Sequence, residues 1–123
     1  MTRILFIASG FPPYEFSENI VNGKLVLALL DAGHHVTVLT KIDEGNTYSN
    51  NWQDPWLPLQ PITNVITYPL GNRVHRLFDI LKNTILLKYP IDGVRWAGLA
   101  YKESLKLIKE QKIDVVITRS PSD

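Results

Sequence analysis

The stretch ILFIASGFPPYEFSEN, residues 4–19, passes from an apolar run through two prolines into a polar segment. Ile4 to Ala8 are all apolar, which is typical of a strand that is buried on both faces of a parallel sheet. Pro12 and Pro13 fix the backbone and donate no hydrogen bond, so they end the strand and stiffen the turn. The stretch therefore predicts the exit of a buried strand and, after it, the start of a helix.

A helix is predicted from Ser17 to Gly33. Ser17 is the expected N-cap, and the Glu18 carboxylate lies favourably near the positive end of the helix dipole. Gly33 is the expected C-terminal glycine, and the interior Gly23 indicates a close approach of the helix to the sheet. Apolar residues at helical spacing predict the buried stripe: Val21, Leu25, Ala28, Leu29 and Ala32.

Three further strands are predicted from runs of apolar and β-branched residues at 36–40, 65–68 and 114–118. The first strand, the helix and the second strand form a βαβ unit, in which the strands are parallel and the crossover is right-handed. We therefore expect an α/β fold. Its architecture is a Rossmann-like three-layer sandwich with a parallel sheet of about four strands in the order 3-2-1-4.

The remaining segments are a long loop and two helices. Residues 41–63 are predicted to be irregular, because prolines and asparagines interrupt them. Trp52 and Trp56 are expected to anchor this loop to the core, with stacking on a sugar ring as the less favoured role. Helices are predicted near 74–85 and 94–111. The expected buried stripe of the second comprises Ala97, Ala100, Tyr101, Leu105 and Ile108.

Composition restricts the class of protein. The 123 residues are 45% hydrophobic, which suits a single folded domain. The chain has no cysteine, so disulfides and cysteine-ligated metals are excluded. The first apolar run is too short to span a membrane, and we expect a cytoplasmic protein. Residues 1–70 hold three basic and six acidic side chains, and residues 71–123 hold ten basic and six acidic ones. This asymmetry is mild, and no nucleic-acid partner is expected.

Known phosphate-binding and metal-binding motifs are absent. The chain has neither a G-x-G-x-x-G fingerprint nor a G-x-x-x-x-G-K-[ST] loop, so dinucleotide and P-loop cofactors are not expected. His34 and His35 have no partners at ligand spacing, so we expect a structural or surface role and no metal. Backbone N–H groups at 17–19 open a helix and could bind an anion, although a merely rigid connection is equally consistent with the residues.

Three motifs together resemble a known family. They are Phe11-Pro12-Pro13, the segment Gly33-His34-His35-Val36-Thr37-Val38-Leu39-Thr40 after a leucine-rich helix, and the ending Ile113-Asp114-Val115-Val116-Ile117-Thr118-Arg119-Ser120-Pro121. In this order they resemble the amino-terminal domain of family-4, GT-B-fold glycosyltransferases. Two departures stand out. Phe16 and Ser17 occupy the place of the family's Gly-Gly pair, and Arg119 occupies that of the second histidine of its fourth strand.

The resemblance implies that residues 1–123 are a partial N-terminal, acceptor-side domain. The parent enzyme would transfer a sugar from a UDP- or GDP-sugar to a glycan or lipid-linked acceptor in polysaccharide biosynthesis, without metal or a covalently bound cofactor. A C-terminal domain outside these residues would hold the nucleotide sugar, so this part alone should be inactive. Its open sheet edge could pair with a second copy. Peripheral attachment to the inner membrane surface, through the basic helix near 74–85, is a secondary expectation.

The candidate site lies where the first and fourth strands end. In the order 3-2-1-4 these strands are neighbours, so their carboxyl ends should converge on one cleft. No catalytic residue is assigned. In the fourth-strand motif, Arg119 could bind a phosphate or carboxylate, and Ser120 would face the loop beside it. The residues expected to form the loop, for the acceptor or the donor phosphates, are Gly10, Phe11, Pro13, Glu15, Ser17, Glu18 and Asn19.

Two other functions remain open. A non-catalytic, glycosyltransferase-like scaffold that binds a partner protein is favoured by the missing Gly-Gly pair. An unrelated flavodoxin-like binding domain would share the same order of strands. The glycosyltransferase is the first interpretation, the scaffold the second and the flavodoxin-like domain the third.

Overall fold

The structure is a computed structural model, and it describes residues 2–13, 17–43, 52–68, 77, 78, 81 and 92–119. Its elements, in chain order, are β1 (Arg3–Ala8), α1 (Ser17–Asp31), β2 (His35–Asp43), the 3₁₀ helix η1 (Leu57–Ile62), β3 (Thr63–Tyr68), α3 (Asp92–Gln111) and β4 (Val115–Arg119). None of the helices in these ranges is long and apolar enough to cross a membrane.

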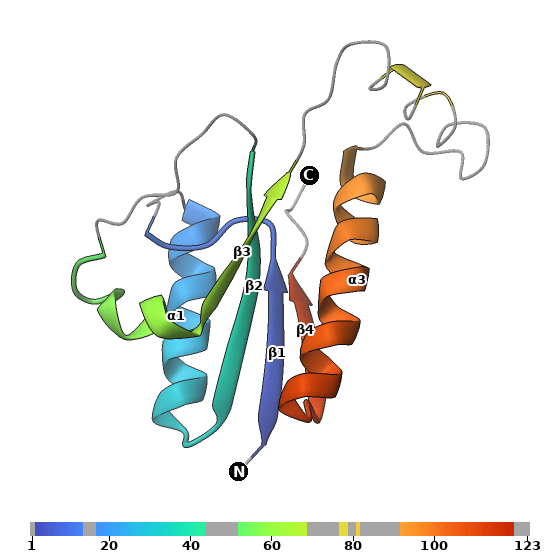
Figure 1. The fold of residues 1–123 in the computed structure, drawn as a ribbon. Coiled ribbons are helices and arrows are strands. Elements are labelled where there is room, and N and C mark those ends of the chain that lie inside the picture. The colour runs from blue at the N-terminus through green and yellow to red at the C-terminus, as the bar shows by residue number, and fades with distance from the viewer. Residues whose placement is uncertain are drawn as a thin grey trace.

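The four strands form one parallel sheet with the order β3-β2-β1-β4, as predicted. In the register, Ile4 of β1 lies opposite Val36 of β2 and Val115 of β4. Figure 1 shows α1 on one side of the sheet and α3 on the other, which makes three layers. The Rossmann-like α/β architecture expected from the sequence is therefore confirmed.

Alternate residues of β1 supply the two halves of the core. Phe6 faces α1 and packs in a cluster that includes Val26 of α1 and Leu59 of η1, all fully buried. Leu5 faces α3 and packs with Leu107. Because successive side chains of a strand point to opposite faces, a strand covered by helices on both sides must be apolar throughout. This requirement explains the continuous run at the start of the chain.

The buried face of α1 differs from the predicted stripe. The buried residues are Asn19, Asn22, Gly23 and Val26, at helical spacing i, i+3, i+4 and i+7. The prediction was wrong for Val21, Leu25, Ala28 and Ala32, which are exposed, while Leu29 is half-buried. The reason is physical: two asparagines take the inner face because they hydrogen-bond there or pack against a glycine, and periodicity of apolar residues cannot reveal that.

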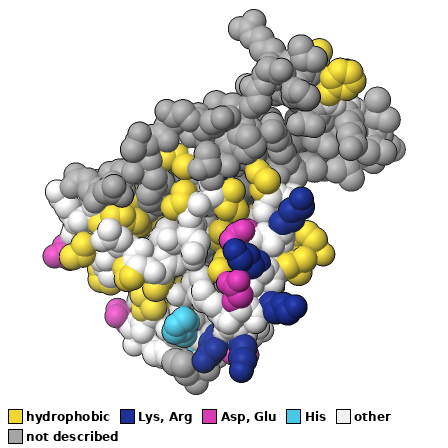
Figure 2. Space-filling view, in the orientation of Figure 1, with side chains coloured by type: hydrophobic (Ala, Val, Ile, Leu, Met, Phe, Trp, Pro, Cys, Tyr) yellow, Lys and Arg dark blue, Asp and Glu magenta, His cyan; other side chains and the backbone are white. Residues whose placement is uncertain are grey.

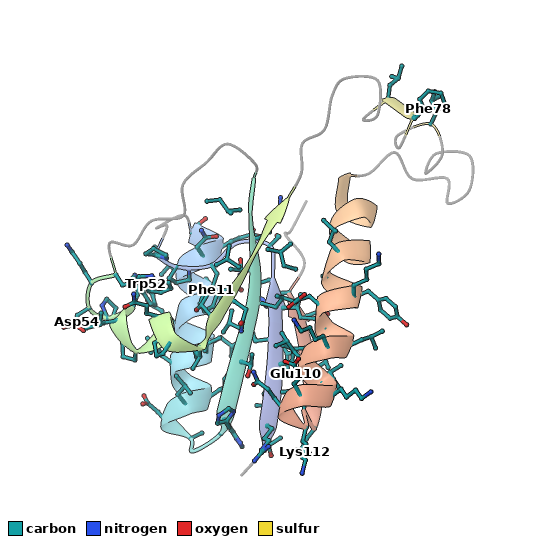
Figure 3. The ribbon with its side chains drawn as sticks, viewed as in Figure 1. Phe11, Trp52, Asp54, Phe78, Glu110 and Lys112 are labelled. Carbon is teal, nitrogen blue, oxygen red and sulfur yellow. The ribbon has the colours of Figure 1, made fainter. Side chains whose placement is uncertain are left out.

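Gly23 allows α1 to approach the segment around η1. A β-carbon at Gly23 would lie 2.6 Å from Cγ of Pro12 and 3.0 Å from Cε3 of Trp56. The close approach is therefore to these two rings, and not to the sheet as expected. Trp56 is buried and Trp52 is partly buried against the same cluster, so both tryptophans anchor this segment, as predicted (Figure 3).

The ends of the elements refine the prediction. Gly33 has φ +89°, and the N–H groups of Gly33 and His34 donate to the carbonyls of Leu30 and Leu29, so a glycine closes α1 as predicted. The expected irregular loop at 41–63 is too long, because β2 continues to Asp43 and η1 forms within it. Most of the predicted helix at 74–85 lies outside the described residues.

The buried face of α3 is also rotated from the predicted stripe. Ala100, Ser104 and Leu107 are buried, whereas Tyr101 and Leu105 are exposed. Ile108 is half-buried, as part of the cluster around Leu5, and the side chain of Ala97 lies outside the described residues. Ser104 lies on the inner face although it is polar, so a stripe traced through apolar residues alone is displaced toward Tyr101 and Leu105.

Polar contacts hold β4 at its amino end. The Arg3 N–H donates to the Asp114 carboxylate at 2.9 Å, and the Asp114 N–H donates to the Arg3 carbonyl at 2.8 Å. The Arg3 guanidinium donates to the carbonyl of Gln111, whose side chain accepts a hydrogen bond from Thr37. Further along, Val115 and Val116 are each 44% exposed on opposite faces of this edge strand.

Candidate functional site

The ends of β1 and β4 meet at one edge of the sheet. Ala8 lies opposite Arg119 in the parallel register, so the turn that leaves β1 and the last residue of β4 are neighbours. Figure 1 shows that α1 begins at this same edge. The convergence predicted from the strand order is therefore present among the described residues.

Asn22 joins the three segments at this edge. Its side-chain N–H donates to the Gly10 carbonyl at 2.8 Å, which ties α1 to the turn after β1. Its side-chain oxygen accepts a hydrogen bond from Arg119 Nε at 3.1 Å, which ties α1 to the end of β4. Asn22 is only 6% exposed, and each of these hydrogen bonds is worth about 1 kcal/mol net. The side chain of Asn22 is thus fixed at both of its polar atoms.

Asn19 lies one turn earlier on the same face of α1. Its side-chain oxygen lies against Gly10, where the β-carbon of any other residue would be. A larger residue at position 10 would therefore require the Asn19 side chain to move. Asn19 is 8% exposed, and no hydrogen bond of its side chain is found within the described part of the chain. Its amide atoms are not among the fully buried polar atoms that lack a hydrogen bond, so the amide is accessible to water or to a ligand.

The structure distributes the other predicted site residues differently. Phe11 is 2% exposed and packs on Phe6, with ring centroids 6.2 Å apart, so its side chain belongs to the core (Figure 3). Pro13 is half-buried, and Ser17 and Glu18 are exposed at the start of α1. Glu15 and Ser120 lie outside the described residues. The predicted residues that the structure brings together are Gly10, Asn19 and Arg119.

Asn22 is the residue of this cluster that the sequence reasoning missed. It lies three positions after Asn19, so the two asparagines share one face of the helix. Asparagine disfavours helix interiors, and two of them on one face of the first turns are a signal of a polar inner surface. A stripe defined by apolar residues alone does not include these asparagines.

The electrostatics of the edge are set by Arg119. Its guanidinium is exposed and makes a single hydrogen bond, to Asn22, and it pairs with no carboxylate within the described ranges. No group of three histidines or carboxylates in those ranges could hold a metal ion. His34 is half-buried, with a ring Nδ1 that lacks a hydrogen bond, and His35 is exposed in β2. The chemistry on offer is therefore recognition of an anion by a positioned cation.

A second charged surface lies on α3, away from this edge. Lys102, Lys106 and Lys109 are exposed at helical spacing on the outer face of the helix. Figure 2 shows Lys and Arg side chains gathered on the α3 side of the molecule, with hydrophobic side chains between them. Among the described residues, the hydrogen bonds of Asn22 and Arg119 do not involve these lysines, and the surface is a solvated helix face.

Comparisons with known proteins add no assignment: family models, curated proteins and solved structures were searched, and none matches the chain. The functional argument therefore rests on the cluster of Gly10, Asn19, Asn22 and Arg119 and on the motifs that surround it.

Proposed function

We propose that the chain is the acceptor-side part of a glycosyltransferase with a Rossmann-like fold. The parent enzyme transfers a sugar from a UDP- or GDP-sugar to a glycan or lipid-linked acceptor, and these residues hold the acceptor. The motifs around Pro12 and His34 support the proposal by their resemblance to family-4 enzymes. The observation that carries it is the side-chain link from Arg119 through Asn22 to Gly10, which builds one polar site from three segments.

The position of the site supports a ligand-binding role. In open parallel sheets, ligands bind outside the carboxyl ends of the strands, beside the turn that follows the first strand. Gly10 and Arg119 occupy those two places on neighbouring strands. The helix that begins there offers N–H groups, and the inner face of α1 offers amides, which are suitable partners for the hydroxyl groups of a sugar.

The donor is assigned to a part of the parent outside these residues. No glycine-rich phosphate motif occurs in the chain, and Phe16 and Ser17 stand where family-4 enzymes have a Gly-Gly pair. A nucleotide sugar should therefore bind the chain weakly or not at all. Neutral saccharides should bind at the edge defined by Gly10, Asn22 and Arg119.

The proposal can be tested by NMR titration of the ¹⁵N-labelled chain. Maltose, cellobiose and chitobiose serve as acceptor probes. UDP-glucose and GDP-mannose test for a donor site, and FMN tests the flavodoxin-like alternative. We expect at least one disaccharide to shift the amides of residues 9–13, 17–22 and 117–119, with a dissociation constant of about 1 mM or weaker. Micromolar binding of FMN would establish the flavodoxin-like alternative, and tight binding of a nucleotide sugar would place the donor site in this half.

A partner-binding scaffold is the second candidate, and one observation favours it. Val115 and Val116 are each 44% exposed on opposite faces of the edge strand β4. Exposed apolar residues on an unpaired edge are a template for another strand. If no saccharide shifts the amides of residues 9–13, 17–22 and 117–119, and the chain self-associates at micromolar concentration, the partner-binding scaffold replaces the glycosyltransferase as the proposed function.

A further inference from the structure

The orientation of the Arg119 side chain leaves the two terminal nitrogens of its guanidinium without a partner among the described residues. A guanidinium carries five N–H donors, and in Arg119 the Nε–H is occupied by Asn22 at 3.1 Å. Within the described residues, the side chain makes no other hydrogen bond. The two terminal nitrogens therefore retain the planar fork that matches a carboxylate or phosphoryl group with two parallel hydrogen bonds.

Asn22 limits the freedom of this fork. Its own amide N–H donates to the Gly10 carbonyl at 2.8 Å, which holds the amide oxygen toward Arg119. An arginine on a surface ordinarily loses side-chain entropy when it is ordered around a ligand. Here part of that cost is already met in the free protein. Asn22 is a positioning residue, because it acts on a ligand only through Arg119.

Asn19 is a second amide at the same place. It is 8% exposed, its amide atoms are not among the fully buried atoms without a hydrogen bond, and it lies against Gly10, the residue whose carbonyl Asn22 binds. Asn19 and Asn22 are three positions apart on one helix, so both amides lie on the same face. An amide N–H₂ is a donor suited to an oxyanion, and such a ligand would supply the partner that Asn19 lacks.

We infer that Arg119, positioned by Asn22 and assisted by Asn19, forms a binding site for an oxyanion carried by the ligand at this edge. The chemistry is that of a phosphoryl or carboxylate group, recognised through the terminal nitrogens of Arg119. The inference rests on the proposed function for the identity of the ligand as a sugar. It then deepens that function, because it predicts that an acidic or phosphorylated saccharide binds more tightly than a neutral one.

The test compares charged and neutral probes on the intact chain. Inorganic phosphate, glucose 1-phosphate, glucuronate and glucose are titrated against the ¹⁵N-labelled protein, and dissociation constants are taken from the amide shifts of residues 10, 19, 22 and 119. We expect glucose 1-phosphate or glucuronate to bind at least about tenfold more tightly than glucose, and the tighter of the two identifies the anion. Equal affinity for charged and neutral sugars overturns the inference.

Variants separate a specific site from general electrostatic attraction. Arg119→Gln should lower oxyanion affinity at least about tenfold, and Arg119→Lys, which keeps the charge and loses the fork, should fall between it and the wild type. Lys106→Gln is the matched control: it removes one exposed cation from α3 and should change affinity less than about twofold. If Arg119→Gln binds phosphate as the wild type does, the inference fails.

Asn22→Asp tests the positioning role. The new carboxylate keeps an acceptor for Arg119, but it loses the N–H that donates to the Gly10 carbonyl and adds a negative charge, so the guanidinium becomes paired and oxyanion affinity should fall as in Arg119→Gln. Urea unfolding of each variant shows whether it is folded, and a folded Asn22→Asp protein that binds oxyanions normally refutes the role.

The outcomes for the two proposals are distinct. Neutral disaccharides that bind while oxyanions do not would overturn this inference and leave the glycosyltransferase proposal standing. If oxyanions bind through Arg119 but no saccharide binds, the oxyanion site is supported and the glycosyltransferase proposal is overturned.

Discussion

Replacing Gly23 with alanine should destabilise the fold, although alanine favours helices. In a helix interior, glycine is about 1 kcal/mol less favourable than alanine, so propensity alone predicts a gain. At Gly23, however, the added β-carbon would lie 2.5 Å from Cζ3 of Trp56 and 2.6 Å from Cγ of Pro12. Both rings are buried and belong to the packed segment next to α1, so the helix must move or the rings must shift.

The magnitude follows from the balance of these two effects. Overpacking of a dense core costs typically about 1–3 kcal/mol, and two simultaneous contacts below 3.0 Å place Gly23 toward the upper end. After the gain from propensity, Gly23→Ala should lose about 1–2 kcal/mol. For a domain of this size that corresponds to a fall in Tm of roughly 3–8 °C.

Gly98 provides the matched control. It also lies inside a helix, α3, but a β-carbon there would meet nothing within 4 Å. Gly98→Ala should therefore gain about 0.5–1 kcal/mol from propensity alone. The two substitutions are chemically identical, and their free energies of unfolding should change in opposite directions.

The assay is urea unfolding followed by far-UV circular dichroism, with thermal melts as a second measure. A double-mutant cycle with Trp56→Leu tests the contribution of the tryptophan: the contact with Pro12 remains in that background, so Gly23→Ala should be less destabilising than in the wild type, with a coupling of about 0.5–2 kcal/mol. If Gly23→Ala stabilises the protein as much as Gly98→Ala does, the packing of η1 on α1 is wrong.

Three other predictions follow from the described contacts. Phe11→Ala removes a side chain that is 2% exposed and should cost about 3–5 kcal/mol in unfolding free energy, whereas Phe78→Ala, at 69% exposed, should change it by less than about 0.5 kcal/mol. Thr37→Val removes the hydroxyl that donates to Gln111 and should cost about 1–2 kcal/mol by urea unfolding; an unchanged midpoint would show that this hydrogen bond contributes nothing. Val116→Lys places a charge on the open edge strand and should abolish any self-association seen by sedimentation velocity, so a variant that still dimerises excludes pairing through β4.

The strands could be predicted because a strand that is buried on both faces requires a continuous run of apolar or β-branched residues. Residues 4–8 and 36–40 are apolar or β-branched throughout, and the short connection between them allows little besides a parallel pair. The order of the strands followed from that unit and from the two later runs. Each predicted strand is present, with ends displaced by at most three residues.

The helix faces were not predictable by the same means. In α1, leucines and valines occur around most of the helix, so the apolar stripe has no unique direction. The face that is buried is chosen by partners elsewhere: Gly10, Pro12, Trp56 and Arg119. These contacts join residues far apart in the chain, and a local pattern holds no record of them.

Part of the candidate site could be predicted from the sequence, and the part that depends on the buried face of α1 could not. Strand order placed Gly10 and Arg119 at one edge, because that depends only on topology. The asparagine that links them depends on which face of α1 is turned inward, which the sequence reasoning had wrong. Phe11 was expected at the site because it belongs to the loop, and its packing on Phe6 shows that position in a loop does not decide where a side chain points.

The bond between Arg119 and Asn22 spans 97 positions of the chain. Contacts of such long range close large loops, and they can form only when the intervening segments have reached their places. The arrangement of the Arg119 guanidinium on Asn22 therefore forms only when the sheet is assembled. A ligand that binds this arrangement binds only the folded domain. By mass action, such a ligand would shift the folding equilibrium of the whole domain.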